Sequence, residues 1–306
     1  MFKPIVQFYQ HQMSRAERLI IWLIGIIVAT AFFYIGVNRL LTHYPGNFYV
    51  PMTWLIVLPF MLAITVVSIY AKDITPRLAF FTRSYGFYYF ILISFGLLAT
   101  GVQYTPFPTI DHFLVACDNA LHFSTPALID WVAAHHRLRI FLIYMYDALT
   151  VEMFLIPLFA SLWRNHWPLD RFFISICVAF LVATTIYYFF PTMAPVSMFH
   201  DQHFLKEEYY TSTKFYEVHH YLRIRFHDPS LIAFPSMHVV WAILLAAIAY
   251  KRAWLFYPLA IVNTLVVLST LLLGWHYLMD ALAGILIAAA SLYFAEYLRR
   301  QYRLYN

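Results

Sequence analysis

Eight long apolar runs constrain this chain more than any other feature of its sequence. Each run holds 17 to 24 residues, and a helix needs about 20 apolar residues to cross the hydrocarbon core of a membrane. Only 11% of the 306 residues are charged, whereas soluble domains average roughly 25%, which excludes a soluble globular protein. We therefore expect an all-α fold, a polytopic bundle of about eight transmembrane helices. The runs cover residues 19–37, 52–71, 85–102, 140–163, 172–190, 234–250, 253–274 and 277–297.

The basic residues indicate how this bundle is oriented. Cytoplasmic loops carry an excess of Lys and Arg, and 13 of the 20 basic residues fall in the two terminal segments and the alternate loops on their side. We therefore expect an integral membrane protein, in a cell (inner) membrane, with both termini in the cytoplasm. The run at 19–37 is too long for a signal-peptide core, and no small-residue cleavage site follows it, so it is expected to remain as the first span.

Two long connections, 103–139 and 191–233, are expected on the opposite, outer face, where short surface helices would cap the bundle. Residues 1–84 would form a cytoplasmic segment with two accessory helices, and residues 85–306 a six-helix core. The two cysteines, Cys117 and Cys177, lie in unlike settings and suggest neither a disulfide framework nor a metal site. The net charge of +5 follows from basic loops, so no nucleic-acid partner is expected.

The first chemically informative stretch reads F-P-S-M-H, at 234–238, where the sixth span begins. Pro235 and Ser236 suit the first turn of a helix, whose unpaired N–H groups and partial positive charge favour a phosphate. His238 in that turn can reach the same anion. The sequence therefore predicts an anion-binding helix start that carries a titratable side chain.

The second stretch reads G-W-H-Y-L-M-D, at 274–280, where the eighth span begins. His276 and Asp280 are four residues apart and share one helical face, so the carboxylate can fix the imidazole tautomer and raise its basicity. Because the sixth and eighth spans both start outside, His238 and His276 are expected at one membrane depth. Such a set can transfer a phosphoryl group, one histidine attacking phosphorus and the other protonating the leaving oxygen.

P-S-x-H followed by H-x-x-x-D across one helical hairpin resembles the type 2 phosphatidic acid phosphatase superfamily. The resemblance covers residues 85–297 at the level of architecture, and it implies an integral membrane enzyme that works through a phosphohistidine. By that resemblance His276 is the nucleophile, Asp280 its orienting partner, and His238 the general acid of the six-helix catalytic core. Ser236 is then a phosphate ligand, and the chemistry needs no metal or other cofactor.

The sequence departs from the family pattern at its basic residues. The third motif, S-R-x5-H-x3-D, is met by Ser269 but has Thr270 in place of arginine, and the first motif, K-x6-R-P, is absent. The fifth span instead ends in Y-Y-F-F-P-T-M-A-P, at 187–195, which resembles the branch that contains inositol phosphorylceramide synthases. Arg223 and Arg225 are the nearest replacements, since an arginine can bind a phosphate through two parallel hydrogen bonds. They could equally snorkel or contact lipid headgroups.

A site at the hydrocarbon boundary favours amphipathic ligands, so a lipid phosphate or diphosphate is the expected substrate. Aromatic side chains are expected to rim this site, namely Tyr187, Tyr188, Trp241, Trp275 and Tyr277. The leading hypothesis is a metal-independent lipid phosphatase or phosphotransferase at the outer, periplasmic or luminal face, with water or a polyol such as inositol as acceptor. The alternatives are a transporter, supported by polytopy alone, and a catalytically silent lipid-binding protein, against which the intact His238, His276 and Asp280 argue.

Other polar residues have weaker claims to function. Asp147 and Glu152 lie inside the fourth span, where acids are costly and usually functional, but they could simply pair with a neighbouring helix. Asp118 resembles part of a family stretch and is more often a helix cap. The adjacent histidines at 135–136 and 219–220 make a metal site or a pH sensor conceivable, although no pair has the i, i+4 spacing of a helical zinc site.

Overall fold

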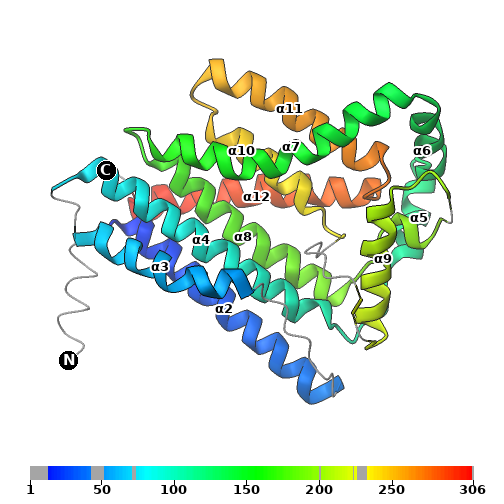
Figure 1. Cartoon of the computed structure of the whole chain (residues 1–306), viewed down its shortest axis with the longest axis horizontal. Helices are drawn as coiled ribbons and strands as arrows, with labels where there is room; N and C mark the ends of the chain where they lie inside the picture. The colour runs from blue at the N-terminus through cyan, green and yellow to red at the C-terminus, as the bar shows by residue number, and fades with distance from the viewer. Residues whose placement is uncertain are drawn as a thin grey trace.

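The computed structural model describes residues 13–42, 52–70, 74–199, 201–222, 224–225 and 233–304. These residues form helices and connecting turns, with no strand among them, and the long helices pack side by side (Figure 1). The expected all-α membrane bundle is therefore confirmed. Its helices are α2 (Arg15–Thr42), α3 (Met52–Tyr70), α4 (Pro76–Gln103), α7 (His136–Ser161), α8 (Trp167–Phe189), α10 (Met237–Ile248), α11 (Ala253–Leu272) and α12 (Leu278–Tyr302).

Six of these helices are long and apolar enough to cross a membrane, namely α2, α4, α7, α8, α11 and α12. Helix α4 starts at Pro76, well before the expected residue 85, because proline suits the first turn of a helix. Helix α10 is only 12 residues long, since the first residues of the expected run at 234–250 form a turn and a helix cap. At 1.5 Å per residue α10 rises about 18 Å, which is less than the roughly 30 Å hydrocarbon core.

Helix α2 packs against α4 and α8 as part of the bundle (Figure 1). Its buried apolar residues recur at helical spacing along one stripe, formed by Ala16, Ile20, Leu23, Ile27, Ala31 and Tyr34. Gly101 of α4 allows a close approach, because a Cβ there would lie 3.1 Å from the carbonyl oxygen of Ala31. Asn38 donates to the Gly101 carbonyl at 2.7 Å and accepts the Tyr188 hydroxyl of α8 at 2.8 Å. These buried polar contacts fix α2 against its neighbours.

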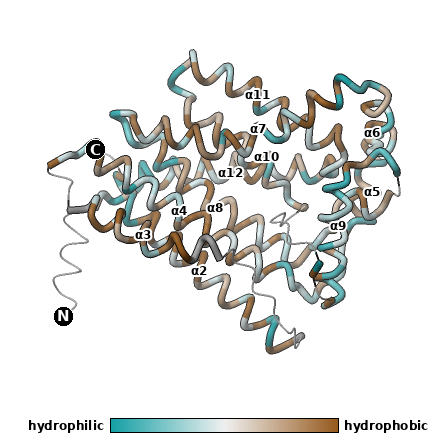
Figure 2. The backbone as a smooth tube through the Cα atoms, viewed as in Figure 1, coloured by the Kyte–Doolittle hydropathy of each residue, from teal (hydrophilic) through white to brown (hydrophobic). Residues whose placement is uncertain are grey.

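Large apolar side chains are exposed along the outside of the bundle. Examples are Trp22 and Phe33 on α2, and Leu286 and Tyr293 on α12, each at least 64% exposed. Figure 2 shows hydrophobic residues along the bundle helices and many hydrophilic ones at α9. A soluble monomer rarely exposes so much contiguous apolar surface, so this surface agrees with a bundle that is embedded in lipid.

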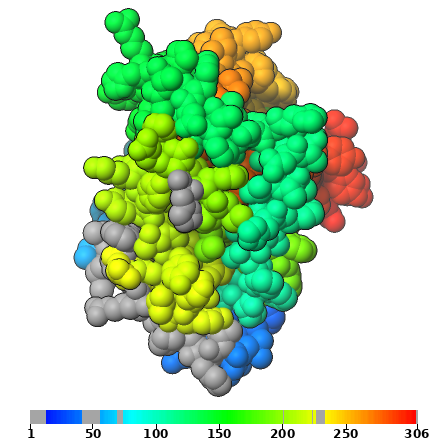
Figure 3. Space-filling model, turned by 90° about the vertical axis from the view of Figure 1, so that its right-hand side faces the viewer, coloured from blue at the N-terminus to red at the C-terminus, as the bar shows by residue number. Residues whose placement is uncertain are grey.

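The two ends of the bundle differ in structure. One end, here named the cap end, is covered by α5 (Asp111–Ala120), α6 (Thr125–Ala134), the short turn η2 (Pro195–Ser197) and α9 (Lys206–His219). Figure 3 looks onto this end, with α9 near the middle of the view and α5 and α6 beside it. The opposite end, here named the basic end, carries Arg77, Arg164, Arg171, Arg252 and Arg299. Arginines there pack on aromatic rings, as Arg252 does on Trp163 at 3.6 Å.

Candidate active site

The turn between α11 and α12 holds His276. Gly274 forms this turn with a φ of 94°, and a Cβ at that position would lie 2.6 Å from the Phe204 ring, so the turn requires glycine. The backbone N–H of His276 donates to the carbonyl of Thr270 at 3.2 Å. Thr270, which stands where the motif has arginine, is buried, and its hydroxyl donates to Val267 of its own helix. The threonine therefore shapes the turn through its backbone.

Asp280, in the first turn of α12, orients the imidazole of His276. Its Oδ2 lies 3.1 Å from Nδ1 of His276 and also accepts the backbone N–H of Tyr277 at 3.0 Å. Both members of the pair are buried, His276 at 3% exposed and Asp280 at 0%. A carboxylate at Nδ1 holds the proton on that nitrogen, so Nε2 carries the lone pair.

Helix α10 brings His238 to the same place. Ser236 is the N-cap of α10, where its hydroxyl accepts a backbone N–H of the first turn at 3.4 Å. The N–H of Ser236 donates to the Asp280 carbonyl at 3.1 Å, and Gly284 permits this contact because a Cβ there would lie 2.7 Å from the Ser236 carbonyl. Nδ1 of His238 then lies 3.3 Å from Nε2 of His276. The structure thus joins the two sequence motifs through both backbone and side chains.

Burial sets the protonation state of His276. It lowers the pKa of this imidazole to about 4, because the charged form is poorly solvated there, although a backbone hydrogen bond with Ala233 opposes the shift. His276 is therefore neutral at pH 7. A neutral imidazole with a free lone pair at Nε2 can act as a nucleophile.

Two further carboxylates, which sequence reasoning did not place at the site, support this turn. Asp118 of α5 accepts the first two backbone N–H groups of α12, at 2.9 and 3.2 Å, so it caps a helix that lies 160 residues further along the chain. Asp111 of α5 accepts the Tyr277 hydroxyl at 3.0 Å and the Met193 N–H at 3.0 and 3.1 Å. Burial raises the pKa of both carboxyls, and their hydrogen-bond donors oppose that shift. The signal in the sequence was their spacing of seven residues, which places both on one helical face.

The structure shows only part of the expected aromatic rim beside the histidines. Tyr187, Tyr188 and Trp241 are buried in the bundle core, and Tyr277 is buried with its hydroxyl on Asp111 of α5. A ring that was not expected there, Tyr146 of α7, packs against the His238 imidazole with ring centroids 4.8 Å apart. Tyr146 also stacks on Trp275, at 4.9 Å and an interplanar angle of 10°. The aromatic neighbours of the histidine pair therefore come from α7 and from the turn before α12.

The arginines expected to bind phosphate are not shown beside the histidines. Arg223 lies outside the described residues. The Arg225 side chain is 75% exposed, and its Nε lies 2.7 Å from Oε1 of Glu217, whose other oxygen accepts the Arg225 backbone N–H at 2.8 Å. Lys214, one turn before Glu217 on α9, is by contrast buried at 3% exposed. The cap therefore holds one exposed, paired arginine and one buried lysine.

The two acids expected inside the fourth span lie apart from the histidines. Asn263 of α11 donates to Oε2 of Glu152 at 2.7 Å, so this acid pairs with a neighbouring helix. Asp147 is exposed on α7. Neither acid is part of the histidine site in this structure.

One group among the described residues could hold a metal ion, formed by Asp130, Asp201 and His203 at the cap end. Nδ1 of His203 lies 2.7 Å from Asp130 and 3.2 Å from Asp201. The group includes none of the adjacent histidine pairs and none of the catalytic candidates. Its hydrogen bonds hold the loop after η2 against α6.

Comparison with protein families matches residues 112–294, which run from α5 into α12, to the PAP2 superfamily. The matched segment contains the three candidate catalytic residues, His238, His276 and Asp280. No curated protein and no solved structure matches the chain. Because the matched segment spans more than half of the 306 residues, the chain belongs to the PAP2 superfamily, whose members are phosphatases.

Proposed function

We propose that this protein cleaves or transfers the phosphate of a lipid through a covalent phosphohistidine on His276. The observation that carries the proposal is the buried line of contacts from Asp280 through His276 to His238, at 3.1 and 3.3 Å. Asp280 holds the proton of Nδ1, so the lone pair of Nε2 points towards His238. A carboxylate, a nucleophile and an acid in this order suit phosphoryl transfer without a metal.

The reaction proceeds in two steps. Nε2 of His276 attacks phosphorus, the bond to the leaving oxygen breaks, and His238 donates a proton to that oxygen. The negative charge of the phosphate favours the imidazolium form of His238 that this step needs. Water or an alcohol then attacks the phosphohistidine, His238 accepts its proton, and the N–P bond breaks. Because the two nitrogens are 3.3 Å apart, in direct hydrogen-bond contact, the imidazoles must separate before phosphorus can lie between them.

A phosphate dianion in this buried site needs compensating positive charge. The first turn of α10, capped by Ser236, supplies N–H groups and the positive end of a helix dipole. Lys214 is a buried cation of the cap, and its neighbour Phe215 belongs to the same buried apolar cluster as Ala233, whose backbone is hydrogen-bonded to His276. Lys214 is therefore one candidate for the phosphate charge.

Arg225 is the other candidate, and the two can be separated by mutation. Arg225 must leave Glu217 before it can clamp a phosphate. If it does so, Arg225→Lys impairs turnover as Arg225→Ala does, because an ammonium cannot form the two parallel hydrogen bonds of a guanidinium. If Lys214 supplies the charge, Lys214→Ala loses activity and Arg225→Ala does not. Wild-type activity in both alanine variants would contradict both assignments.

We also propose that the active site faces the outer, periplasmic or luminal, side of the membrane, with both termini in the cytoplasm. Helix α7 starts at the cap end and ends beside Arg164, so the arginines and the turn that holds His276 lie at opposite ends of the bundle (Figure 1). The positive-inside rule then assigns the basic end to the cytoplasm. A lipid substrate is supported by the short α10, because its 12 residues rise about 18 Å, less than the roughly 30 Å hydrocarbon core, and a first turn within that core would be reached by a lipid.

The decisive experiment incubates the purified protein with lipid phosphates and diphosphates, with and without polyol acceptors, and identifies the products by mass spectrometry. The segment at 187–195 supports a relation to the inositol phosphorylceramide synthase branch, for which a polyol adduct is the expected product. Rapid acid-free quenching with a radiolabelled substrate should trap phosphohistidine in wild type and not in His276→Ala. His135→Ala, which changes an exposed histidine of the cap end, is the matched control and should keep wild-type labelling. Full turnover by His276→Ala would overturn the proposal.

A further inference from the structure

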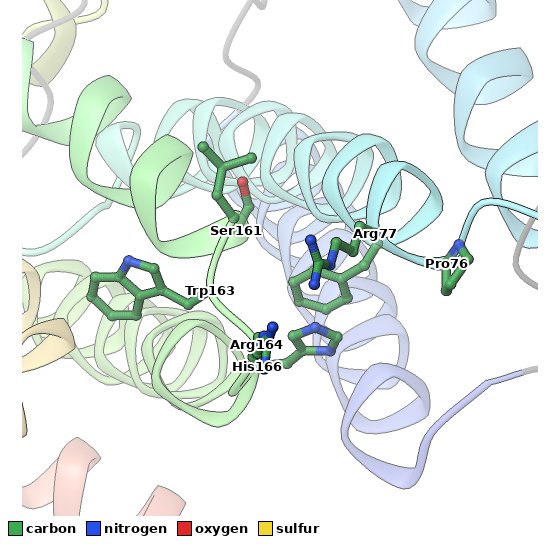
Figure 4. Close-up of a pocket in the computed structure, with 8 residues that line it drawn as sticks. Pro76, Arg77, Ser161, Trp163, Arg164 and His166 are labelled. Atoms are coloured by element: carbon green, nitrogen blue, oxygen red, sulfur yellow. The ribbon is translucent and has the colours of Figure 1, made fainter.

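A pocket lies at the basic end of the bundle, far from the proposed catalytic histidines. Its walls are the first turn of α4, the last turn of α7 and the loop that leads into α8, and its volume is about 380 Å³ (Figure 4). Helix α7 has 26 residues, so at 1.5 Å per residue it separates this pocket from the cap end by about 39 Å. The pocket is therefore distinct from the proposed active site.

Two arginines and a histidine line this pocket. Arg77 comes from α4, Arg164 and His166 come from the loop, and Figure 4 shows the three side chains gathered around the hollow. The lining contains no carboxylate. Within the described part of the chain, neither arginine forms an ion pair. The pocket thus concentrates positive charge without an internal counter-ion from these residues.

Aromatic packing orders two parts of the pocket wall, His166 and Trp163. The His166 ring stacks on Phe80, with centroids 3.4 Å apart and an interplanar angle of 10°. Trp163, another wall residue, carries the guanidinium of Arg252 over its ring at 3.6 Å. A third arginine therefore stands behind the pocket wall. The positive-inside rule explains the sign of these charges, but it does not explain why they surround a hollow.

The neighbouring acid does not neutralise the pocket. Glu17 of α2 forms a buried ion pair with Arg83 of α4, at 2.5 Å, so its charge is already balanced. Burial lowers the pKa of His166, with Glu17 opposing this shift. His166 is then neutral at pH 7 and can donate an N–H to an anion beside the two arginines.

We propose that this pocket binds a phosphate anion, carried by a lipid headgroup or by a soluble phosphate compound. Two guanidinium groups suit the bidentate recognition of phosphate, and the start of α4 at Pro76 adds the positive end of a helix dipole. The volume falls within the roughly 300–1,000 Å³ of ligand sites. A lipid is the favoured source, because the pocket lies where the apolar helix α4 begins and the apolar helix α7 ends, and the exposed Leu162 forms part of its wall.

Native mass spectrometry of the purified full-length chain tests this proposal. One arm titrates short-chain phosphatidylglycerol and the other inorganic pyrophosphate, with wild type compared with Arg77→Ala/Arg164→Ala. We expect wild type to retain one more ligand than the double variant, or to bind it at least tenfold more tightly. Lipid retention that pyrophosphate does not displace identifies a headgroup site, whereas retention of pyrophosphate itself identifies a soluble ligand.

The matched control is Arg300→Ala, which removes an arginine that is 81% exposed near the C-terminal end of α12 and outside the pocket lining. It should bind both ligands as wild type does. An equal loss in Arg300→Ala would show a general charge effect and overturn the proposal, as would unchanged binding of both ligands in the double variant. If the double variant does not fold, His166→Phe keeps the stack on Phe80 and removes the ring nitrogens. Several-fold weaker binding in that variant supports the pocket, and unchanged binding overturns it.

Discussion

Replacement of Asp118 by Ala should damage both stability and catalysis, although this residue does not contact a catalytic histidine. Asp118 accepts the first two N–H groups of α12, at 2.9 and 3.2 Å, and is 3% exposed. Each lost hydrogen bond of this kind costs about 1 kcal/mol, so the loss of both should lower the free energy of unfolding by about 2 kcal/mol. The cost of about 1 kcal/mol for losing a helix cap is not added, because the same two bonds form the cap.

The effect on turnover follows from the position of the cap. His276 lies two residues before α12 and Asp280 lies in its first turn, so fraying of this turn displaces His276, the proposed nucleophile, from its carboxylate. A misplacement of about 1 Å can lower a rate on the order of 100-fold, and we expect a loss of this size in kcat with a smaller change in KM.

The assay compares steady-state turnover and thermal unfolding of Asp118→Ala, Asp118→Asn and wild type in the same detergent. Asn keeps one acceptor oxygen and should fall between the other two in both measurements. The control is Asp147→Ala, which changes an exposed acid of α7 and should leave both quantities near wild type. If Asp118→Ala kept wild-type stability and kcat, the capping argument would be refuted.

Three further predictions concern the histidines and the topology. His238→Ala should still form the phosphoenzyme from a substrate with an acidic leaving group, because such a group needs no general acid, and quench-flow labelling measures this. Since burial lowers the pKa of His276 to about 4, its nucleophilic neutral form predominates above that pH. Phosphoenzyme formation from the same substrate should therefore decline only as the pH falls towards 4, and a midpoint near 6.5 would contradict the burial argument. In a cysteine-free background, Lys206→Cys and Lys251→Cys should label from opposite sides of the membrane, and an impermeant reagent that reaches both from outside would contradict the topology.

The fold was predictable to the extent that it depends on the length and hydropathy of single segments. Apolar runs longer than about 17 residues identify spans without any knowledge of their neighbours. The same reasoning overestimated the length of α10, because hydropathy does not show that Pro235 and Ser236 form a turn and a cap and are not part of the helix. It also misplaced Tyr187, Tyr188 and Trp241, which lie in the bundle core, since helices that are apolar on all sides give no sign of which face points inward.

The contact between His276 and Asp280 was predictable because the two residues are only four apart. The structure forms it at the start of α12 and not on one helical face, since Tyr277 is the N-cap with an extended backbone and His276 lies before the helix. Asp111 and Asp118 act on groups more than 80 residues away, and no local pattern encodes such a contact. Arg225 was assigned to phosphate from its charge and its position shortly before Ser236, whereas the structure gives it Glu217 as a partner. A charge in a loop does not reveal what neutralises it.

The backbone contact between the segments that carry His238 and His276 bears on how the proposed site can open. The N–H of Ser236 donates to the Asp280 carbonyl, and the helices approach so closely that a Cβ at Gly284 would lie 2.7 Å from the Ser236 carbonyl. A hinge movement between α10 and α12 would break this hydrogen bond, whereas rotation of a ring makes room for phosphorus without that loss. The ring that can turn is that of His238, which is only partly buried and rests on Tyr146. Under the proposed mechanism, loading of the site is then a rotamer change of His238 that gives up its contacts with the Tyr146 ring and with Nε2 of His276.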